Sequence, residues 1–176
     1  TPDGTMFVTT KGNSRITKLS GSSIVALAGQ PADAIVLGVG GMMGLAVDPD
    51  FATNRRIYAC FLSNLGSFGG RDVRVARFEV DAGSTTLSNR TDIVTGIPVN
   101  TAGQAGRHSG CRPRFGPDGH LYIGTGDAAT GTYPQSTTSL GGKVLRVDTN
   151  GAGVAGNPGV DDPGSGFDPR IFTANP

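Results

Sequence analysis

The stretch Pro117-Asp118-Gly119, followed by Leu121-Tyr122-Ile123, decides the fold because the same phrase occurs twice more along the chain. Pro2-Asp3-Gly4 stands before Met6-Phe7-Val8, and Pro49-Asp50-Phe51 stands before Ile57-Tyr58-Ala59. Proline presets the first central position of a turn, and the apolar and aromatic residues that follow suit a buried strand. Each phrase therefore predicts a turn that leads into a strand.

A second run follows each phrase after a loop, with polar and apolar residues in alternation. These runs are residues 15–19, 73–78 and 143–147. The alternation has the period of two that is typical of a half-buried strand. The last two phrases are each preceded by a short candidate for an inner strand, at residues 44–47 and 112–115. The repeated unit is thus strand, Pro-Asp turn, strand, loop and strand.

Repeated units with this order of strands are typical of β-propeller blades, and three units predict about three blades. The fold class we expect is therefore all-β. Propellers close with about four to eight blades, so residues 1–176 are expected to be a fragment or one part of an assembly, with a further blade beginning at Ile171-Phe172-Thr173. A β-sandwich in which the Pro-Asp turns recur by chance is the alternative.

Composition excludes several classes of partner. The 29 Gly and 11 Pro fit many short strands, and a net charge of +1 without basic runs disfavours nucleic acid and anionic membranes. No apolar stretch is long enough for a membrane span, and few lysines among many Thr, Ser and Gly favour an exported protein. Cys60 and Cys111 are either one bridge in a secreted protein or two thiols in a cytosolic one. Because neighbouring blades bring such positions together, we expect them to lie within bridging distance.

Two loop segments offer residues for chemistry. His108 lies in a Gly- and Ser-rich loop before an inner strand, and Asp127 ends the strand that follows. Such a histidine can take a proton from an alcohol, and a carboxylate can orient its ring. From the residues alone, the favoured explanation of the pair is a polar loop histidine and an aspartate that caps a turn. His120, inside a Pro-Asp-Gly-His turn, is interpreted as solvated.

Five motifs in the same order resemble the glucose/sorbosone dehydrogenase family. They are GMMGLAVDPDF at residues 41–51, RHSGCR at 107–112, FGPDG at 115–119, GTGD at 124–127 and LGGKVLRVD at 140–148. The resemblance implies three blades of a six-bladed ring, in a secreted or periplasmic quinoprotein that oxidises sugars or alcohols. It implies hydride transfer to pyrroloquinoline quinone, with calcium polarising the quinone, and it assigns the base to His108 and the neighbouring aspartate to Asp127. Most cofactor and calcium ligands are expected outside this chain, and the electron acceptor is not assigned.

Two departures from the family support a second reading. Val39 stands where the family usually has glutamine or glutamate, and Arg107 stands where some members have aspartate. Both favour a propeller module that binds carbohydrate or protein without oxidising it, whereas His108 and Asp127 favour the enzyme. A third reading is an inert segment that self-associates through open sheet edges. The acidic stretch at residues 157–168 is interpreted as a solvated loop, with calcium as the alternative.

Overall fold

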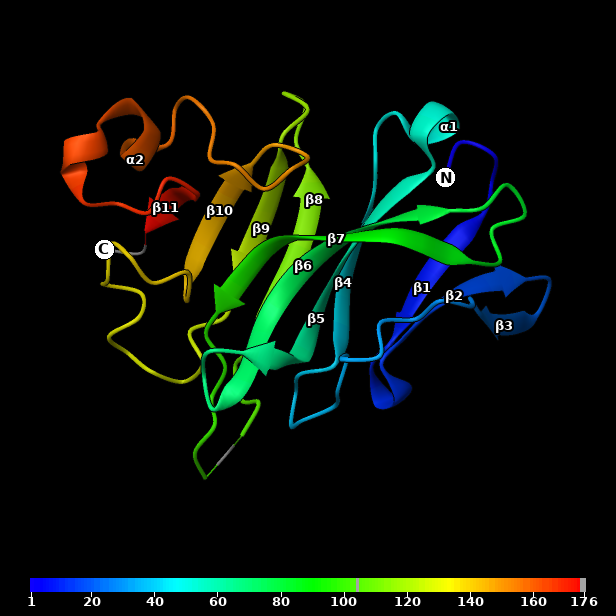
Figure 1. Ribbon diagram of the computed structural model, residues 1–176, viewed down its shortest axis with the longest axis horizontal. Coiled ribbons are helices and arrows are strands. Elements are labelled where there is room, and N and C mark those ends of the chain that lie inside the picture. Colours follow the sequence, from blue (N-terminus) through cyan, green and yellow to red (C-terminus); the bar gives the residue numbers. More distant parts are fainter. Residues whose placement is uncertain (104, 175–176) are drawn as a thin grey trace.

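The computed structural model describes residues 1–103 and 105–174, and within them the regular structure is almost entirely β. Within each of three sheets, every strand pairs antiparallel with its neighbour in sequence (Figure 1). The first sheet has β1 (Met6–Thr10), β2 (Arg15–Ser20) and β3 (Ser23–Ala26). The second has β4 (Met42–Val47), β5 (Arg56–Gly66), β6 (Gly70–Val80) and β7 (Leu87–Ile97), and the third has β8 (Gly110–Phe115), β9 (Leu121–Thr125), β10 (Lys143–Val147) and β11 (Ile171–Ala174). The all-β prediction is confirmed.

Helical structure among the described residues is limited to single turns. These are α1 (Phe51–Asn54), α2 (Pro158–Asp161) and two 3-10 turns at Lys11–Asn13 and Pro163–Ser165. No helix in residues 1–103 or 105–174 has the length and apolar character that a membrane crossing needs.

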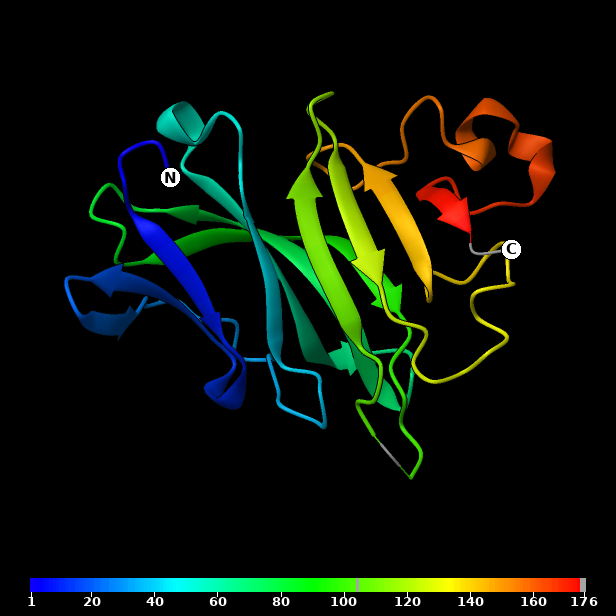
Figure 2. The ribbon, with the colours of Figure 1, turned by 180° about the vertical axis from the view of Figure 1, so that it is seen from behind.

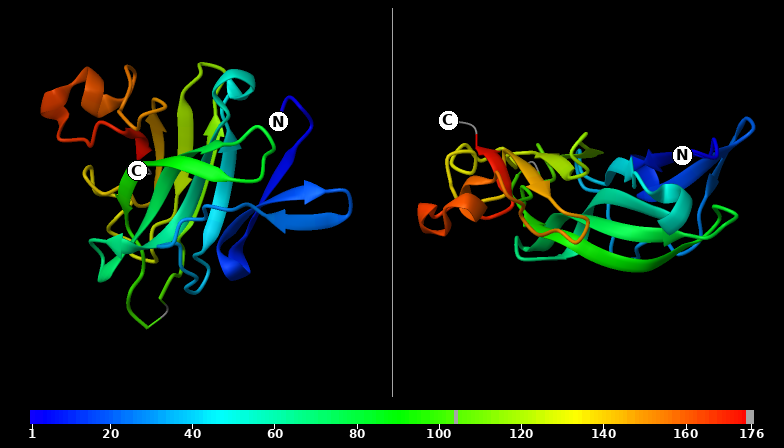
Figure 3. Two further views of the ribbon diagram at one scale, coloured as in Figure 1. Left: turned by 45° about the vertical axis from the view of Figure 1, so that its right-hand side comes forward. Right: turned by 90° about the horizontal axis from the view of Figure 1, so that it is seen from above.

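The three Pro-Asp phrases take equivalent places. Those of the second and third units join β4 to β5 and β8 to β9, and the first leads into β1. The side chain of Asp3 accepts a hydrogen bond from the amide of Thr5 at 3.0 Å, and Asp118 accepts one from the amide of His120 at 3.2 Å. This local bond stabilises the turn ahead of the strand. The three sheets follow one another as propeller blades do (Figures 2 and 3).

The second sheet is packed on both faces. Along β5, Tyr58, Cys60 and Leu62 belong to a core shared with the third sheet, while Ile57, Ala59 and Phe61 belong to a core shared with the first. Residues 73–78 of β6, expected to form a half-buried strand, are instead almost wholly buried. The expectation was wrong because a sheet between two others has no solvent face. Residues 143–147 keep the predicted alternation, with Lys143, Leu145 and Val147 buried.

Outer strands differ most from the sequence prediction. β3 and β7 were not predicted, since β3 is exposed throughout and β7 shows no regular alternation of buried residues. The residues expected to open a further blade form β11, which pairs with β10 through Leu145 opposite Ile171 and is the fourth strand of the third sheet. That expectation was wrong because a fourth strand carries the same apolar pattern as a first strand.

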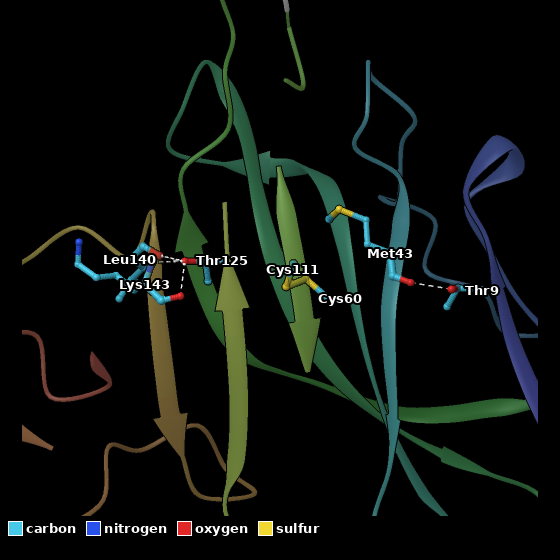
Figure 4. The surroundings of a disulfide bond; sticks show 7 residues. All are labelled: Thr9, Met43, Cys60, Cys111, Thr125, Leu140 and Lys143. Carbon is cyan, nitrogen blue, oxygen red and sulfur yellow. Dashed lines mark hydrogen bonds between the residues drawn. A yellow bond between two sulfur atoms is a disulfide. The ribbon is translucent and has the colours of Figure 1, made fainter. Parts of the chain in front are cut away.

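Adjacent sheets are linked by a disulfide and by a hydrogen bond (Figure 4). Cys60 in β5 and Cys111 in β8 form the predicted bridge, with their Cα atoms 6.1 Å apart. The hydroxyl of Thr9 in β1 donates to the carbonyl oxygen of Met43 in β4 at 2.6 Å. β4 also packs against β1 on one side and β8 on the other. These contacts hold the loop that leads into β4 next to the loop that leads into β8.

Candidate active site

His108 and Asp127 meet where the loop before β8 reaches the end of β9. The Nδ1 atom of His108 lies 2.9 Å from Oδ1 of Asp127. The two residues are therefore within hydrogen-bonding reach, as predicted, and their chemical roles stay a prediction. The imidazole is 50% exposed, so a ligand can approach it. The backbone of His108 has a φ of 51°, in the left-handed region that residues other than glycine seldom adopt.

Asp127 is held as a carboxylate by its own turn. The amide of Ala129 donates to its Oδ1 at 2.8 Å. This bond lowers the pKa of Asp127; partial burial opposes the shift, and the contact with His108 lowers the pKa further. An ionised carboxylate at this position accepts the Nδ1 hydrogen of the imidazole and leaves Nε2 on the far side. The segment is tied down because the amide of Ala128 donates to the carbonyl oxygen of His108 at 3.2 Å.

Arg107 contacts the second nitrogen of the imidazole. Its Nε atom donates to Nε2 of His108 at 3.2 Å. With Asp127 at Nδ1 and Arg107 at Nε2, the hydrogen-bond partners assign the ring hydrogen to Nδ1 and a lone pair to Nε2. Sequence comparison marks Arg107 as a departure from the family, but only the folded chain shows that it contacts the histidine.

A cavity of about 600 Å³ lies between the starts of the inner strands β4 and β8 and the end of β1. Its lining combines the cationic residues Lys11 and Arg112 with the apolar residue Met43, whereas Met42, also in the lining, is almost wholly buried in the core. Cationic donors next to apolar surface suit a flat anionic molecule. No cofactor-binding residue was predicted from the sequence, because the approach of Lys11 to Arg112 across two sheets leaves no local signal.

A second cavity of about 350 Å³ has Arg107, the residue that contacts His108, in its lining and shares Val39 with the first. It is lined by Gly38, Val39, Gly103, Ala105 and Arg107. Two loops form it, and they approach so closely that a Cβ added at Gly106 would lie 1.8 Å from the carbonyl oxygen of Leu37. Gly106 also has a φ of 75°, which other residues rarely adopt. Glycine at this position allows the loop that carries Arg107 to reach the loop that carries Val39.

A third cavity, about 500 Å³, has Asp127, Thr125 and Lys143 in its lining. The ammonium of Lys143 donates to the carbonyl oxygens of Tyr133 at 2.7 Å and Pro134 at 2.8 Å, and burial lowers its pKa. Thr125 donates to the carbonyl oxygen of Leu140 at 2.6 Å (Figure 4). Lys143 and Thr125 thus hold the loop between β9 and β10 next to Asp127. Sequence reasoning missed Lys143, although a lysine at an inward position of a strand is the signal.

Carboxylates do not gather into a metal site in the described part of the chain, where no three His, Cys, Asp or Glu side chains converge. In the acidic stretch 157–168, Asp161 accepts from the amide of Gly156 at 2.9 Å and Asp162 from that of Gly164 at 2.9 Å. Asp168 pairs with Arg170 at 2.6 Å. These carboxylates therefore stabilise their own loop.

Known proteins share this arrangement of sheets. The model of the glucose/sorbosone dehydrogenase family matches residues 1–174. The chain is 30% identical to the aldose sugar dehydrogenase YliI of Escherichia coli K12, over 91% of this chain and 42% of that protein. It superposes with a TM-score of 0.77 and 31% identity on the quinone-bound aldose sugar dehydrogenase of Streptomyces coelicolor, covering 90% of this chain and 45% of that one. For a putative oxidoreductase (glucose dehydrogenase) of Thermus thermophilus, the TM-score is 0.82 with 31% identity, covering 97% of this chain and 47% of that one.

The blade-like succession of all-β sheets defines a partial β-propeller, as in the dehydrogenases described above. The chain belongs to the glucose/sorbosone dehydrogenase family. It spans less than half the length of the relatives described above.

Proposed function

We propose that this chain is part of a dehydrogenase that oxidises a sugar or alcohol by hydride transfer to pyrroloquinoline quinone. The observation that carries the proposal is the 2.9 Å contact between Nδ1 of His108 and Oδ1 of Asp127. Asp127 fixes the ring so that Nε2 faces away from the carboxylate and accepts the hydroxyl proton of the substrate. The substrate hydroxyl would give its proton to His108, and the quinone, when bound, would supply the acceptor for the hydride of the same carbon, so that both electrons leave as the carbonyl forms.

The quinone supplies, when bound, the hydride acceptor that protein side chains lack. It is a planar polycarboxylate, and the cavity between β4 and β8 offers Lys11 and Arg112 for its carboxylates and Met43 for its ring face. We assign these residues to its binding on that chemistry. Calcium needs several oxygen ligands, and since no three His, Cys, Asp or Glu side chains converge among the described residues, we assign none of these side chains to it.

We further propose that residues 1–176 form the amino-terminal portion of a six-bladed ring and that the protein is secreted or periplasmic. The coverage of 42–47% of the relatives supports the first point. The buried disulfide between Cys60 and Cys111 supports the second, since such bridges persist in oxidising compartments.

Dye-linked sugar oxidation by the complete, quinone-reconstituted protein tests the function. His108→Ala should lower kcat by about 10²–10⁴-fold, the usual contribution of a general base, and Asp127→Asn should lower it by a smaller factor. Quinone binding, followed by absorbance titration, should stay within about threefold of wild type in both variants. A wild-type protein that binds sugar or quinone but oxidises nothing would refute the enzyme and favour the non-catalytic binding module.

A further inference from the structure

The cavity lined by Arg107 and Val39 has a cation and an apolar wall where a neutral sugar would need hydrogen-bond acceptors. We propose that it selects a sugar that carries a carboxylate, and that this carboxylate pairs with Arg107 and thereby releases Nε2 of His108. The inference rests on the proposed function and names the substrate class of the same site.

The charge around this cavity favours an anionic ligand. Arg107 lines the cavity with Val39, which is 55% exposed, and with the small residues Gly38 and Ala105. None of its described lining residues has a carboxylate, and the adjoining cavity adds Lys11 and Arg112. The carboxylate of Asp127 lies on the other side of the imidazole, against Nδ1. A guanidinium binds a carboxylate with two parallel hydrogen bonds, whereas it offers a sugar hydroxyl one ordinary donor contact.

Arg107 also occupies the nitrogen that must act as the base. Its Nε atom donates to Nε2 of His108 at 3.2 Å, so the lone pair that must take the substrate proton is engaged. A proton on Nε2 would face the guanidinium and place two positive charges side by side, which is unfavourable. Arg107 must therefore move away before His108 can act as a base. A carboxylate on the substrate gives the guanidinium a stronger partner, and a neutral sugar does not.

The backbone around Arg107 is anchored on both sides, whereas its side chain lies at the surface. The hydroxyl of Ser109, which is fully buried, donates to the carbonyl oxygen of Gly106 at 2.8 Å. Gly106 in turn lies against the backbone of Leu37. Arg107, between these anchors, is an exposed residue. The side chain of Arg107 can therefore turn towards a ligand while the backbone of Gly106 and Ser109 stays in place.

The test compares glucuronate with glucose as substrates of the complete, quinone-reconstituted protein. Wild type should show a kcat/KM for glucuronate at least tenfold above that for glucose. Arg107→Gln should lower kcat/KM for glucuronate by about ten- to hundredfold, the value of a charge-assisted pair, and should not lower that for glucose. The matched control is Lys18→Gln, which removes the same charge from β2 of the first sheet. The ammonium of Lys18 donates to the carbonyl oxygen of Gly83, and this variant should keep the wild-type preference.

Direct binding separates this inference from the proposed function. If no sugar is oxidised, calorimetry with glucuronate and glucose decides: glucuronate binding that weakens at least tenfold in Arg107→Gln upholds the inference while the enzyme fails. Arg112→Gln should weaken quinone binding and leave the glucuronate preference unchanged, which distinguishes carboxylates of the cofactor from that of the substrate. The inference would be overturned if wild type preferred glucose or bound both sugars equally. It would also be overturned if Arg107→Gln lowered kcat/KM, or weakened binding, equally for both sugars.

Discussion

A Cβ added to Gly126 would lie 1.8 Å from the carbonyl oxygen of His108. The end of β9 therefore reaches the histidine loop only because residue 126 lacks a side chain. The same approach lets the amide of Ala128 donate to that carbonyl oxygen at 3.2 Å. Because Gly126 directly precedes Asp127, this contact sets the distance between the carboxylate and the imidazole.

Gly126→Ala should separate the two segments. We expect a loss of about 1–3 kcal/mol in the free energy of unfolding, as for other overpacked sites, and slower sugar oxidation. Urea denaturation and dye-linked assays measure the two effects. Gly124→Ala is the matched control, because nothing lies within 4 Å of a Cβ at that position. Equal stability of the two variants would contradict the close approach.

The bridge between Cys60 and Cys111 should contribute strongly to stability. It joins β5 of the second sheet to β8 of the third and closes a loop with a sequence separation of 51. Loop-closure entropy gives a stabilisation of about 4 kcal/mol. Urea denaturation of the Cys60→Ala/Cys111→Ala protein should show a loss of this order, and added reductant should change its midpoint no further. A loss below about 1 kcal/mol would show that packing alone holds the two sheets together.

Asp33 should make stability depend on acid pH. Burial alone would raise its pKa, but hydrogen bonds from Arg90 and Ser63 lower it to about 2. Since the unfolded carboxyl has a pKa of about 3.9, its stabilising contribution is fully present above about pH 4 and is lost as pH falls towards 2. Asp33→Asn should be less stable at pH 6 and should lose less stability between pH 4 and pH 2 than wild type. Asp50→Asn, at an exposed turn position, controls for removal of one carboxylate.

An Asp33→Asn protein with the same acid profile as wild type would contradict this account. Asp72 acts in the opposite direction, because burial raises its pKa despite the amide of Gly96 and the guanidinium of Arg74. Its charged form is disfavoured in the folded protein, so it does not explain a loss of stability in acid.

The sequence predicts the strands that alternate or are wholly apolar, and it fails for those that face solvent. The Pro-Asp turns and the strands that follow them are signalled by turn chemistry and burial. β3 has no buried residue, so it leaves no periodic signal, and β11 carries a pattern that fits either the end of one sheet or the start of another. Burial on both faces of β6 depends on two neighbouring sheets, which the local pattern does not contain.

Part of the site is similarly predictable. His108 and Asp127 are identifiable because each stands in a short motif that contains glycine. The contact of Arg107 with Nε2 of His108 and the hydrogen bonds from Lys143 to backbone carbonyls are not identifiable from sequence. Both depend on loop conformations that bring together backbone and side-chain atoms. Lys11 and Arg112 come from different sheets, and only their packing makes them neighbours.

Single-turnover reduction of the bound quinone by sugar, followed by stopped-flow absorbance, tests the central claim most directly, because it isolates the chemical step from release and reoxidation. We predict that His108→Ala slows this step by about 10²–10⁴-fold, while His120→Ala, a change at a histidine in the turn between β8 and β9, leaves the rate at the wild-type value. Reduction by His108→Ala at the wild-type rate would contradict the assignment of His108 as the base.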